Sequence, residues 1–180
     1  MVFVHLADGF EEIEALTVVD VLRRARIETE TVSIMGTLPV TGAHGIRVIA
    51  DILFEDAVYD DCELIVLPGG MPGATNLDEH ARLREKIQSF AVHGKKIAAI
   101  CAAPLALGHA GVLEGKEATC YPGFEEELTG AVLSDENVCV SDNITTSRGP
   151  GMAMKFALEL VRQLKGDKAS KLVAEGMLFK

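Results

Sequence analysis

The sequence lacks several features that define particular classes of protein. It has no tryptophan and only two tyrosines, and its 17 basic side chains against 27 acidic ones leave a formal net charge of −10. This shortage of lysine and arginine disfavours nucleic acid and anionic membrane surfaces as partners, because both attract cationic proteins. No apolar run is long enough to span a membrane. The first residues reach Asp8 without a basic leader, so a strand is expected there rather than a signal peptide.

Cysteine is also scarce, and its spacing excludes two common uses. The four cysteines stand at positions 62, 101, 120 and 139, with no Cys-x-x-Cys pair and no neighbouring histidine. This spacing indicates neither a zinc site nor a disulfide framework, and we expect no metal and no cofactor. Unpaired cysteines are typical of a reducing compartment, so the cytoplasm is the expected location.

Composition and periodicity predict one α/β domain over residues 1–180. Apolar residues make up 48% of the chain, which is ample for a single core. Short apolar runs that suit buried parallel strands alternate with stretches of helical period. We therefore expect a flavodoxin-like, doubly wound and mostly parallel sheet with helices on both faces, a three-layer sandwich. The expected strands are 2–7, 28–35, 63–67, 97–100, 117–120, 137–141 and 144–147, with a hairpin within 38–51; the expected helices are 10–25, 78–92 and 152–164, with shorter ones beginning at 102 and 167.

Cys101 stands at the junction between an expected strand and an expected helix. The run 97–100 suits a buried strand, and Pro104 is tolerated in the first turn of the helix after it. Helix N–H groups at such a junction favour an anion, so a thiolate forms more easily there. From these residues alone, a small cysteine packed under a helix is an equally good interpretation.

Glu14 lies on an apolar face of the expected first helix. It shares that face with Val18 and Val21 at helical spacing. A carboxyl group in an apolar stripe needs a partner, whereas Asp8 and Glu11 have the spacing of a helix-capping box. An exposed Glu14 remains the alternative, because the helix is apolar on more than one side.

A glycine-rich turn, PGGMPG at 68–73, comes after the expected strand 63–67. Its spacing matches neither the phosphate loop nor the dinucleotide fingerprint, so nucleotides are discounted. An oxyanion site and a simple tight turn are equally compatible with these residues. Because ligands bind at the carboxyl ends of strands in doubly wound sheets, we expect Glu14, this turn and Cys101 to lie together.

Five motifs succeed one another along the chain, and together they are specific. They are GFEEIEA at 9–15, VDVLRRA at 19–25, LPGG at 67–70, AAICAAP at 98–104 and TSRGPG at 146–151. In these motifs the chain resembles the ThiJ/PfpI superfamily, and within it the branch of the parkinsonism-associated deglycase, across nearly its whole length.

The resemblance implies a homodimer in which Arg24 lies near the shared site, as the apolar breadth of the first helix also suggests. It implies a nucleophilic, oxidisable Cys101 with Glu14 as its partner acid. It also implies that backbone amides surround the reacting oxygen, namely those of Gly69, Gly70 and Ala102.

Two positions depart from the family pattern. Tyr121 stands where members of this branch often have a histidine, which leaves any acid–base step there open, although a phenol can donate a hydrogen bond. Ala102 comes directly after the nucleophile, where peptidase-like relatives have a histidine, so a Cys–His dyad is missing at that position. The histidines of the chain are expected on the surface or in packing roles, namely His5, His44, His80, His93 and His109.

The activity implied by the resemblance is that of a glyoxalase or deglycase acting on 2-oxoaldehydes such as methylglyoxal and on their adducts. A buried carboxyl beside a thiol shares one proton with it; if Glu14 keeps that proton, Cys101 is a thiolate able to attack an aldehyde. On this basis we expect Cys101 to be the most acidic of the four cysteines. The alternative is a redox sensor or chaperone-like protein whose thiol is oxidised to a sulfinate. Amide hydrolysis is the weakest hypothesis, because it needs a positioned base such as histidine.

Overall fold

Seven strands form the central sheet of the molecule, which a computed structural model describes over all residues 1–180. The strands are β1 (Val2–Leu6), β2 (Thr29–Ser33), β5 (Ile52–Leu53), β6 (Leu64–Leu67), β7 (Lys96–Ile100), β10 (Val138–Ser141) and β11 (Ile144–Ser147). They lie in the order β10, β11, β7, β6, β1, β2, β5, and every pairing is parallel except that of β10 with β11. The expected mostly parallel sheet is confirmed.

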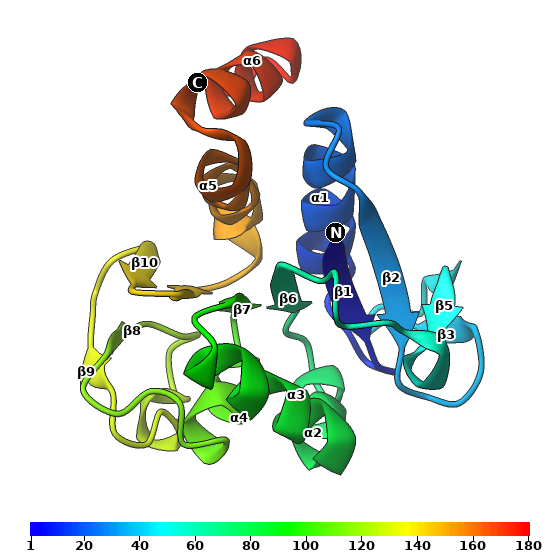
Figure 1. Cartoon of the computed structure of the whole chain (residues 1–180), viewed down its shortest axis with the longest axis vertical. Coiled ribbons are helices and arrows are strands. Elements are labelled where there is room, and N and C mark those ends of the chain that lie inside the picture. Colours follow the sequence, from blue (N-terminus) through cyan, green and yellow to red (C-terminus); the bar gives the residue numbers. More distant parts are fainter.

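Helices cover both faces of this sheet. They are α1 (Glu12–Arg24), α2 (Gly73–Glu79), α3 (Ala81–Val92), α4 (Pro104–His109), α5 (Ala153–Lys165) and α6 (Asp167–Gly176). Figure 1 shows α1, α5 and α6 on one side of the sheet and α2, α3 and α4 on the other. This is the three-layer, flavodoxin-like arrangement that the sequence predicts. None of these helices has the length and apolar character needed to cross a membrane.

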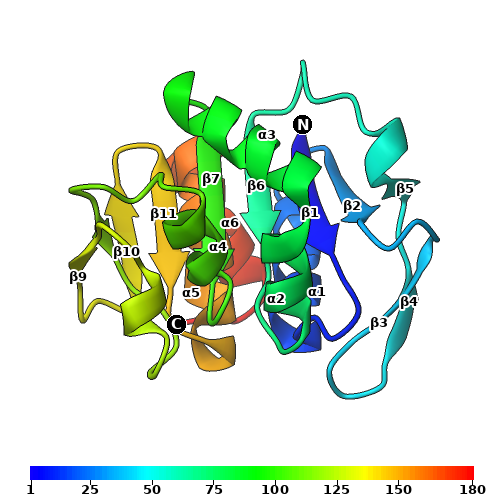
Figure 2. The ribbon, with the colours of Figure 1, turned by 90° about the horizontal axis from the view of Figure 1, so that it is seen from below.

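Two smaller pairs of strands lie outside the central sheet. The antiparallel pair β3 (Pro39–Thr41) and β4 (Arg47–Ile49) is the hairpin expected within 38–51, and it projects beside β2 in Figure 2. The short strand expected at 117–120 is β8 (Glu117–Ala118), which pairs only with β9 (Val132–Leu133). The β3–β4 hairpin packs against the start of α1, where the amide of His44 donates a hydrogen bond to Glu12 at 2.8 Å.

The direction of winding changes between β1 and β6, and this change positions the functional site. From β1 the chain proceeds outward to β2 and β5, then returns to β6 on the other side of β1 and continues to β7 and β11. The loops after β1, β6 and β7 therefore meet at the carboxyl edge of three adjacent strands.

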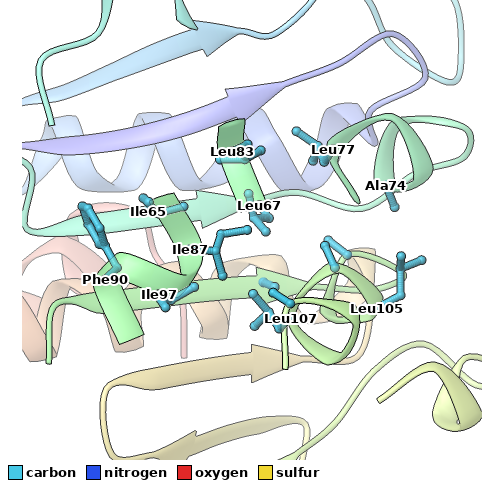
Figure 3. Packing of buried hydrophobic residues seen from close by; sticks show 14 of the residues in the cluster. Ile65, Leu67, Ala74, Leu77, Leu83, Ile87, Phe90, Ile97, Leu105 and Leu107 are labelled. Carbon is cyan, nitrogen blue, oxygen red and sulfur yellow. The ribbon is translucent and has the colours of Figure 1, made fainter. Parts of the chain in front are cut away.

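Alternating side chains of the strands divide the core into two layers. In β6, Ile65 and Leu67 belong to the cluster under α2, α3 and α4, whereas Leu64 and Val66 belong to the cluster under α1 and α5. Figure 3 shows Ile87 of α3 above the first of these layers, close to Ile65, Leu67 and Leu107. Strands buried on both faces explain the uninterrupted apolar runs in the sequence.

The expected helix 78–92 is wrong at its start, because the structure has two helices there. Helix α2 already begins after Pro72, and His80 adopts an extended conformation between α2 and α3. The Nδ1 atom of His80 accepts a hydrogen bond from the amide of Leu83 at 3.1 Å and so caps α3. A histidine in a capping role interrupts the helix without the glycine or proline that usually signals a break.

The capping residue of α1 also differs from the expectation. The side chain of Glu11 caps the helix by accepting from the amide of Ile13 at 3.2 Å. Asp8 instead accepts from the amide of Thr41 at 2.8 Å and ties the loop after β1 to the hairpin. Asp8 therefore bonds to a residue 33 positions away instead of forming the local capping box.

Helix α3 provides a matched test of the core. Ile87 is 1% exposed and Val92, on the same helix, is 84% exposed. We expect Ile87→Ala to lower the free energy of unfolding by about 2–5 kcal/mol, because it leaves a cavity. Val92→Ala should change it by less than about 0.5 kcal/mol. Urea denaturation at a fixed protein concentration measures both, and equal losses in the two variants would contradict the two-layer core.

Candidate active site

Cys101 occupies a strained turn directly after β7. Its φ of 65° lies in the left-handed region, which costs a residue with a side chain about 1–3 kcal/mol. Two backbone hydrogen bonds hold it there: its amide donates to the carbonyl of Ser147 at 2.9 Å, and its carbonyl accepts from the amide of Tyr121 at 2.8 Å. The strand-to-helix junction expected from the sequence is thus a turn pinned by two neighbouring segments.

Glu14 is fully buried against this turn. One carboxylate oxygen, Oε2, accepts from the amide of Gly69 at 2.7 Å, and the carboxyl group interacts with the Cys101 thiol. The other oxygen, Oε1, has no hydrogen-bond partner. A buried carboxylate oxygen without a donor is uncommon, and it leaves one basic atom of the pair without a partner.

Gly69 leaves the space in which these two side chains meet. A Cβ atom at this position would lie 2.6 Å from Cys101 Cβ and 2.8 Å from Glu14 Oε2. Because the amide of Gly69 donates to Glu14, it is not free to bind an oxyanion. The amides of Gly70 and Ala102 instead act on the sulfur, where they lower the pKa of Cys101.

Burial raises the pKa of both acids in the pair. It is the main cause of the shift in Glu14, whose pKa rises to about 7, and the charge of Glu11 adds to it. Burial also dominates in Cys101, whose pKa rises to about 12, and the charge of Glu14 adds to it. The pair therefore holds two protons well below pH 7, and one proton with one negative charge above it.

The expectation that Cys101 is the most acidic cysteine does not hold when Glu14 is ionised. In that charge state its pKa of about 12 exceeds those of Cys62 and Cys120, both about 11 because of burial. The expectation assumed a protonated Glu14. An ionised Glu14 instead holds the thiol proton, so the thiolate appears only as Glu14 takes that proton over.

Two residues expected at the site lie at different distances from it. Tyr121 is close: its backbone binds Cys101, its ring packs on Gly149 and is 46% exposed, and its hydroxyl makes no hydrogen bond to Cys101. Arg24 lies at the other end of α1, about 15 Å from Glu14 along the helix axis, and pairs with Asp20 at 2.7 Å. Within one chain, Arg24 therefore does not reach Cys101.

No histidine of the chain contacts Cys101. His5, for example, is fully buried and lies 2.7 Å from the hydroxyl of Tyr59. Sequence reasoning did miss Ser147, whose carbonyl fixes the Cys101 turn and whose hydroxyl donates to the carbonyl of Asn137 at 2.7 Å. The motif at 146–151 marked this segment, but its contact with Cys101 depends on the pairing of β11 with β7.

A model of one protein family matches most of the chain. The model of the DJ-1/PfpI family matches residues 1–163. The chain belongs to the DJ-1/PfpI family. This finding confirms the resemblance that the five motifs indicate.

Individual members of the DJ-1/PfpI family match nearly the whole chain. Protein dj-1beta of Drosophila melanogaster is 36% identical over 97% of this chain and 95% of its own length. The glutathione-independent glyoxalase DJR-1.2 of Caenorhabditis elegans is 34% identical over 91% of this chain and 88% of its own. Protein DJ-1 homolog B of Arabidopsis thaliana is 39% identical over 99% of this chain, which spans only 41% of that protein. The chain likewise spans 46% of the related homolog A.

A solved DJ-1 structure has the same fold. The oxidized DJ-1 of Toxoplasma gondii superposes with a TM-score of 0.95 at 37% identity, covering 99% of this chain and 97% of that one. The overall fold of the chain is therefore that of an experimentally known DJ-1 structure.

The raised pKa of Glu14 predicts a pH dependence of stability. The folded-state pKa of about 7 lies above the ordinary value of 4.5, so the folded protein binds the proton more tightly and loses stability as pH rises from 4.5 through 7. The loss amounts to roughly 3 kcal/mol. Glu14→Gln lacks this titration, so its stability relative to wild type should increase by most of that amount, about 2.5 kcal/mol, between pH 5 and 8.

Urea denaturation at both pH values measures the difference. Cys101→Ser is the control: it should keep the wild-type pH dependence, because burial rather than the thiol is the main cause of the Glu14 shift. Parallel pH profiles for wild type and Glu14→Gln would contradict the raised pKa.

Proposed function

We propose that this protein converts 2-oxoaldehydes such as methylglyoxal into 2-hydroxy acids and acts on their adducts as a deglycase, with Cys101 as the nucleophile. The observation that supports this most is the buried pair of Glu14 and Cys101, which shares one proton at a strained turn. A relative named as a glutathione-independent glyoxalase supports the same reaction class. Because Cys101 supplies the thiol, the reaction needs no glutathione and no bound cofactor.

The first step is attack of the sulfur on the aldehyde carbon. The reactive form is the singly charged pair in which the proton resides on Glu14 and the charge on sulfur. Formation of the carbon–sulfur bond moves the carbonyl electrons onto oxygen, where the amides of Gly70 and Ala102 can donate hydrogen bonds. Glu14 gives its proton to this oxygen and becomes a carboxylate, yielding a hemithioacetal.

The second step moves hydrogen between two carbons. Oε1 of Glu14, which has no partner in the chain, is suited to take the proton from the former aldehyde carbon. The electron pair passes to the adjacent carbonyl oxygen, giving an enediolate. Glu14 returns the proton to the second carbon, while the hydroxyl proton on the former aldehyde oxygen moves to the enediolate oxygen and leaves a carbonyl group behind. The product is a thioester of the 2-hydroxy acid, and water cleaves it to release the acid and restore the thiol.

Tyr121 is proposed as an auxiliary donor at the edge of the site. Its half-exposed ring on Gly149 and its backbone link to Cys101 support a position near an incoming substrate. A phenol stays protonated at neutral pH, so it can donate a hydrogen bond but is a poor base. The proton transfers are therefore assigned to Glu14.

Substitution of Glu14 tests the reaction. Glu14→Gln keeps the size and a hydrogen-bond donor but cannot exchange a proton, so turnover of methylglyoxal should fall about 10²–10⁴-fold. Lactate formation without glutathione is the measurement. Cys101→Ser should abolish turnover, and melting temperatures check that both variants are folded. Near-wild-type turnover in Glu14→Gln would remove Glu14 as the proton carrier.

A redox-sensing function is the second candidate, and one observation favours it. Cys101 is the most exposed of the four free cysteines at 9%, and the donors around its sulfur suit a sulfinate. The free thiols are consistent with the reducing cytoplasm as the place of action. The same preparations used for turnover distinguish the two functions after treatment with limiting peroxide.

Oxidation should depend on Glu14 less than turnover does, because glutamine still donates a hydrogen bond to the sulfinate. Mass spectrometry should find the two-oxygen adduct on Cys101 first. If wild type has no turnover yet oxidises selectively at Cys101, the sensor function replaces the enzyme function. First oxidation at Cys62, Cys120 or Cys139 counts against both.

We also propose that the protein is a homodimer that uses α1. Ile13 and Leu16 are apolar residues on this helix with exposed fractions of 56% and 40%, and Arg24 lies further along the same helix. A second copy would cover them and bring its Arg24 toward the first copy's site. Light scattering should give a dimeric mass at micromolar concentration, and Leu16→Lys should lower it. A monomeric wild type would refute the proposal.

A further inference from the structure

A second polar cluster lies where the β3–β4 hairpin meets the start of α1. It consists of Glu11, Glu12 and His44, and their ligand atoms all lie within 4.8 Å of one another. The Nδ1 atom of His44 lies 2.8 Å from Oε2 of Glu12 and 3.6 Å from Oε2 of Glu11. The two carboxylate side chains are 10% and 5% exposed, whereas the histidine is 68% exposed. Two nearly buried acids therefore face one accessible imidazole nitrogen.

Backbone amides hold each carboxylate by its other oxygen. Oε1 of Glu12 accepts from the amides of His44 at 2.8 Å and Ile46 at 3.4 Å, and Oε1 of Glu11 accepts from the amide of Ile13 at 3.2 Å. Oε2 of Glu11 accepts no hydrogen bond and points to His44. Both Oε2 atoms thus lie near Nδ1, within a group of ligand atoms that spans at most 4.8 Å, and backbone amides orient the carboxylates as in metal sites.

The hairpin backbone is shaped around this arrangement. A Cβ atom at Gly42 would collide with the carboxylate of Glu12, so only glycine lets this side chain enter the turn. An ordinary surface ion pair needs no such accommodation. The site uses different side chains from the active pair, because Glu14 bonds to Gly69, although burial and, to a lesser degree, the charge of Glu11 raise the pKa of Glu14.

We propose that Glu11, Glu12 and His44 form a binding site for a divalent transition-metal ion such as Zn²⁺. One imidazole nitrogen and two carboxylate oxygens suit zinc, cobalt, nickel or copper better than calcium or magnesium, which prefer oxygen alone. Ligand bonds of about 2.0–2.2 Å would set the donor atoms roughly 3–3.5 Å apart. The present 2.8 and 3.6 Å are close to this spacing, and the exposed His44 can adjust.

Charge supports a cation at this point. The ion pair with a protonated His44 neutralises only one of the two buried carboxylates, and the protein as a whole has a formal charge of −10. A divalent ion neutralises both carboxylates and releases the imidazole proton. The exposed side of His44 leaves coordination positions open for water, for a small ligand or for a group from a partner.

Cobalt titration of the full-length Cys101→Ser chain tests the site, because the active-site thiol cannot contribute there. After removal of metals with a chelator, CoCl₂ should bind with one equivalent per chain and produce d–d absorption. Glu12→Gln, which keeps an oxygen for the backbone amides, and His44→Ala should each weaken binding at least about 10-fold. Competition with ZnCl₂ should displace the cobalt.

His109→Asn is the matched control. His109 also contacts two carboxylates, but Asp78 lies 2.8 Å from Nδ1 and Glu127 lies 2.9 Å from Nε2, so the acids are on opposite sides and cannot share an ion with it. Cobalt binding should be unchanged in this variant. Melting temperatures confirm that the variants are folded. If Glu12→Gln proves unstable, His44→Ala, at an exposed position, still decides the test.

Three results would overturn the proposal. These are the absence of saturable cobalt binding, binding that Glu12→Gln and His44→Ala leave unchanged, and binding that requires Cys101. The third result would assign the ion to the active pair instead. None of these outcomes depends on the aldehyde reaction, so the metal site and the proposed function fail or succeed separately.

Discussion

The burial of a carboxyl group against a thiol is the interaction on which the rest of the site depends. Two acids in this place cannot both be charged, so they hold one proton between them once the pH exceeds the Glu14 pKa of about 7. The surrounding backbone supports this arrangement: Gly69 orients the carboxylate, while the amides of Gly70 and Ala102 face the sulfur. The left-handed turn at Cys101 is maintained because two neighbouring segments bind its amide and its carbonyl.

One proton with two possible positions relates the two candidate functions. With the proton on Glu14, the sulfur is a nucleophile toward an aldehyde and equally toward peroxide. The functions differ in the demands they then make on Glu14: the aldehyde reaction requires it to release and regain its proton, whereas a sulfinate requires only a stationary donor. The side chain of Glu14 therefore distinguishes them better than Cys101, whose loss abolishes both.

Much of the fold and the meeting of the site residues can be predicted from sequence. Apolar runs flanked by helical periods predict the parallel sheet, and the change of winding beside β1 brings Glu14, Gly69 and Cys101 to one edge. The break at His80 could not be predicted, because a histidine cap has no strong sequence signal. The pKa of Cys101 could not be predicted either, because whether it is raised or lowered depends on which partner of the pair holds the proton. The cluster at His44 joins residues more than 30 positions apart, and only the packed hairpin reveals it.

For the reaction proposed above, the absence of a side chain at Gly69 restricts how the substrate could change. The floor beneath the reacting atoms has no room for even a methyl group, since the nearest atoms belong to the two residues that react. Variation there would disable the chemistry instead of redirecting it. Selectivity must therefore evolve, or be engineered, from the rim, where the half-exposed Tyr121 can be exchanged without touching the proton pair. In the proposed function, the same architecture thus separates a fixed reaction from an adjustable entrance at the loops after the strands.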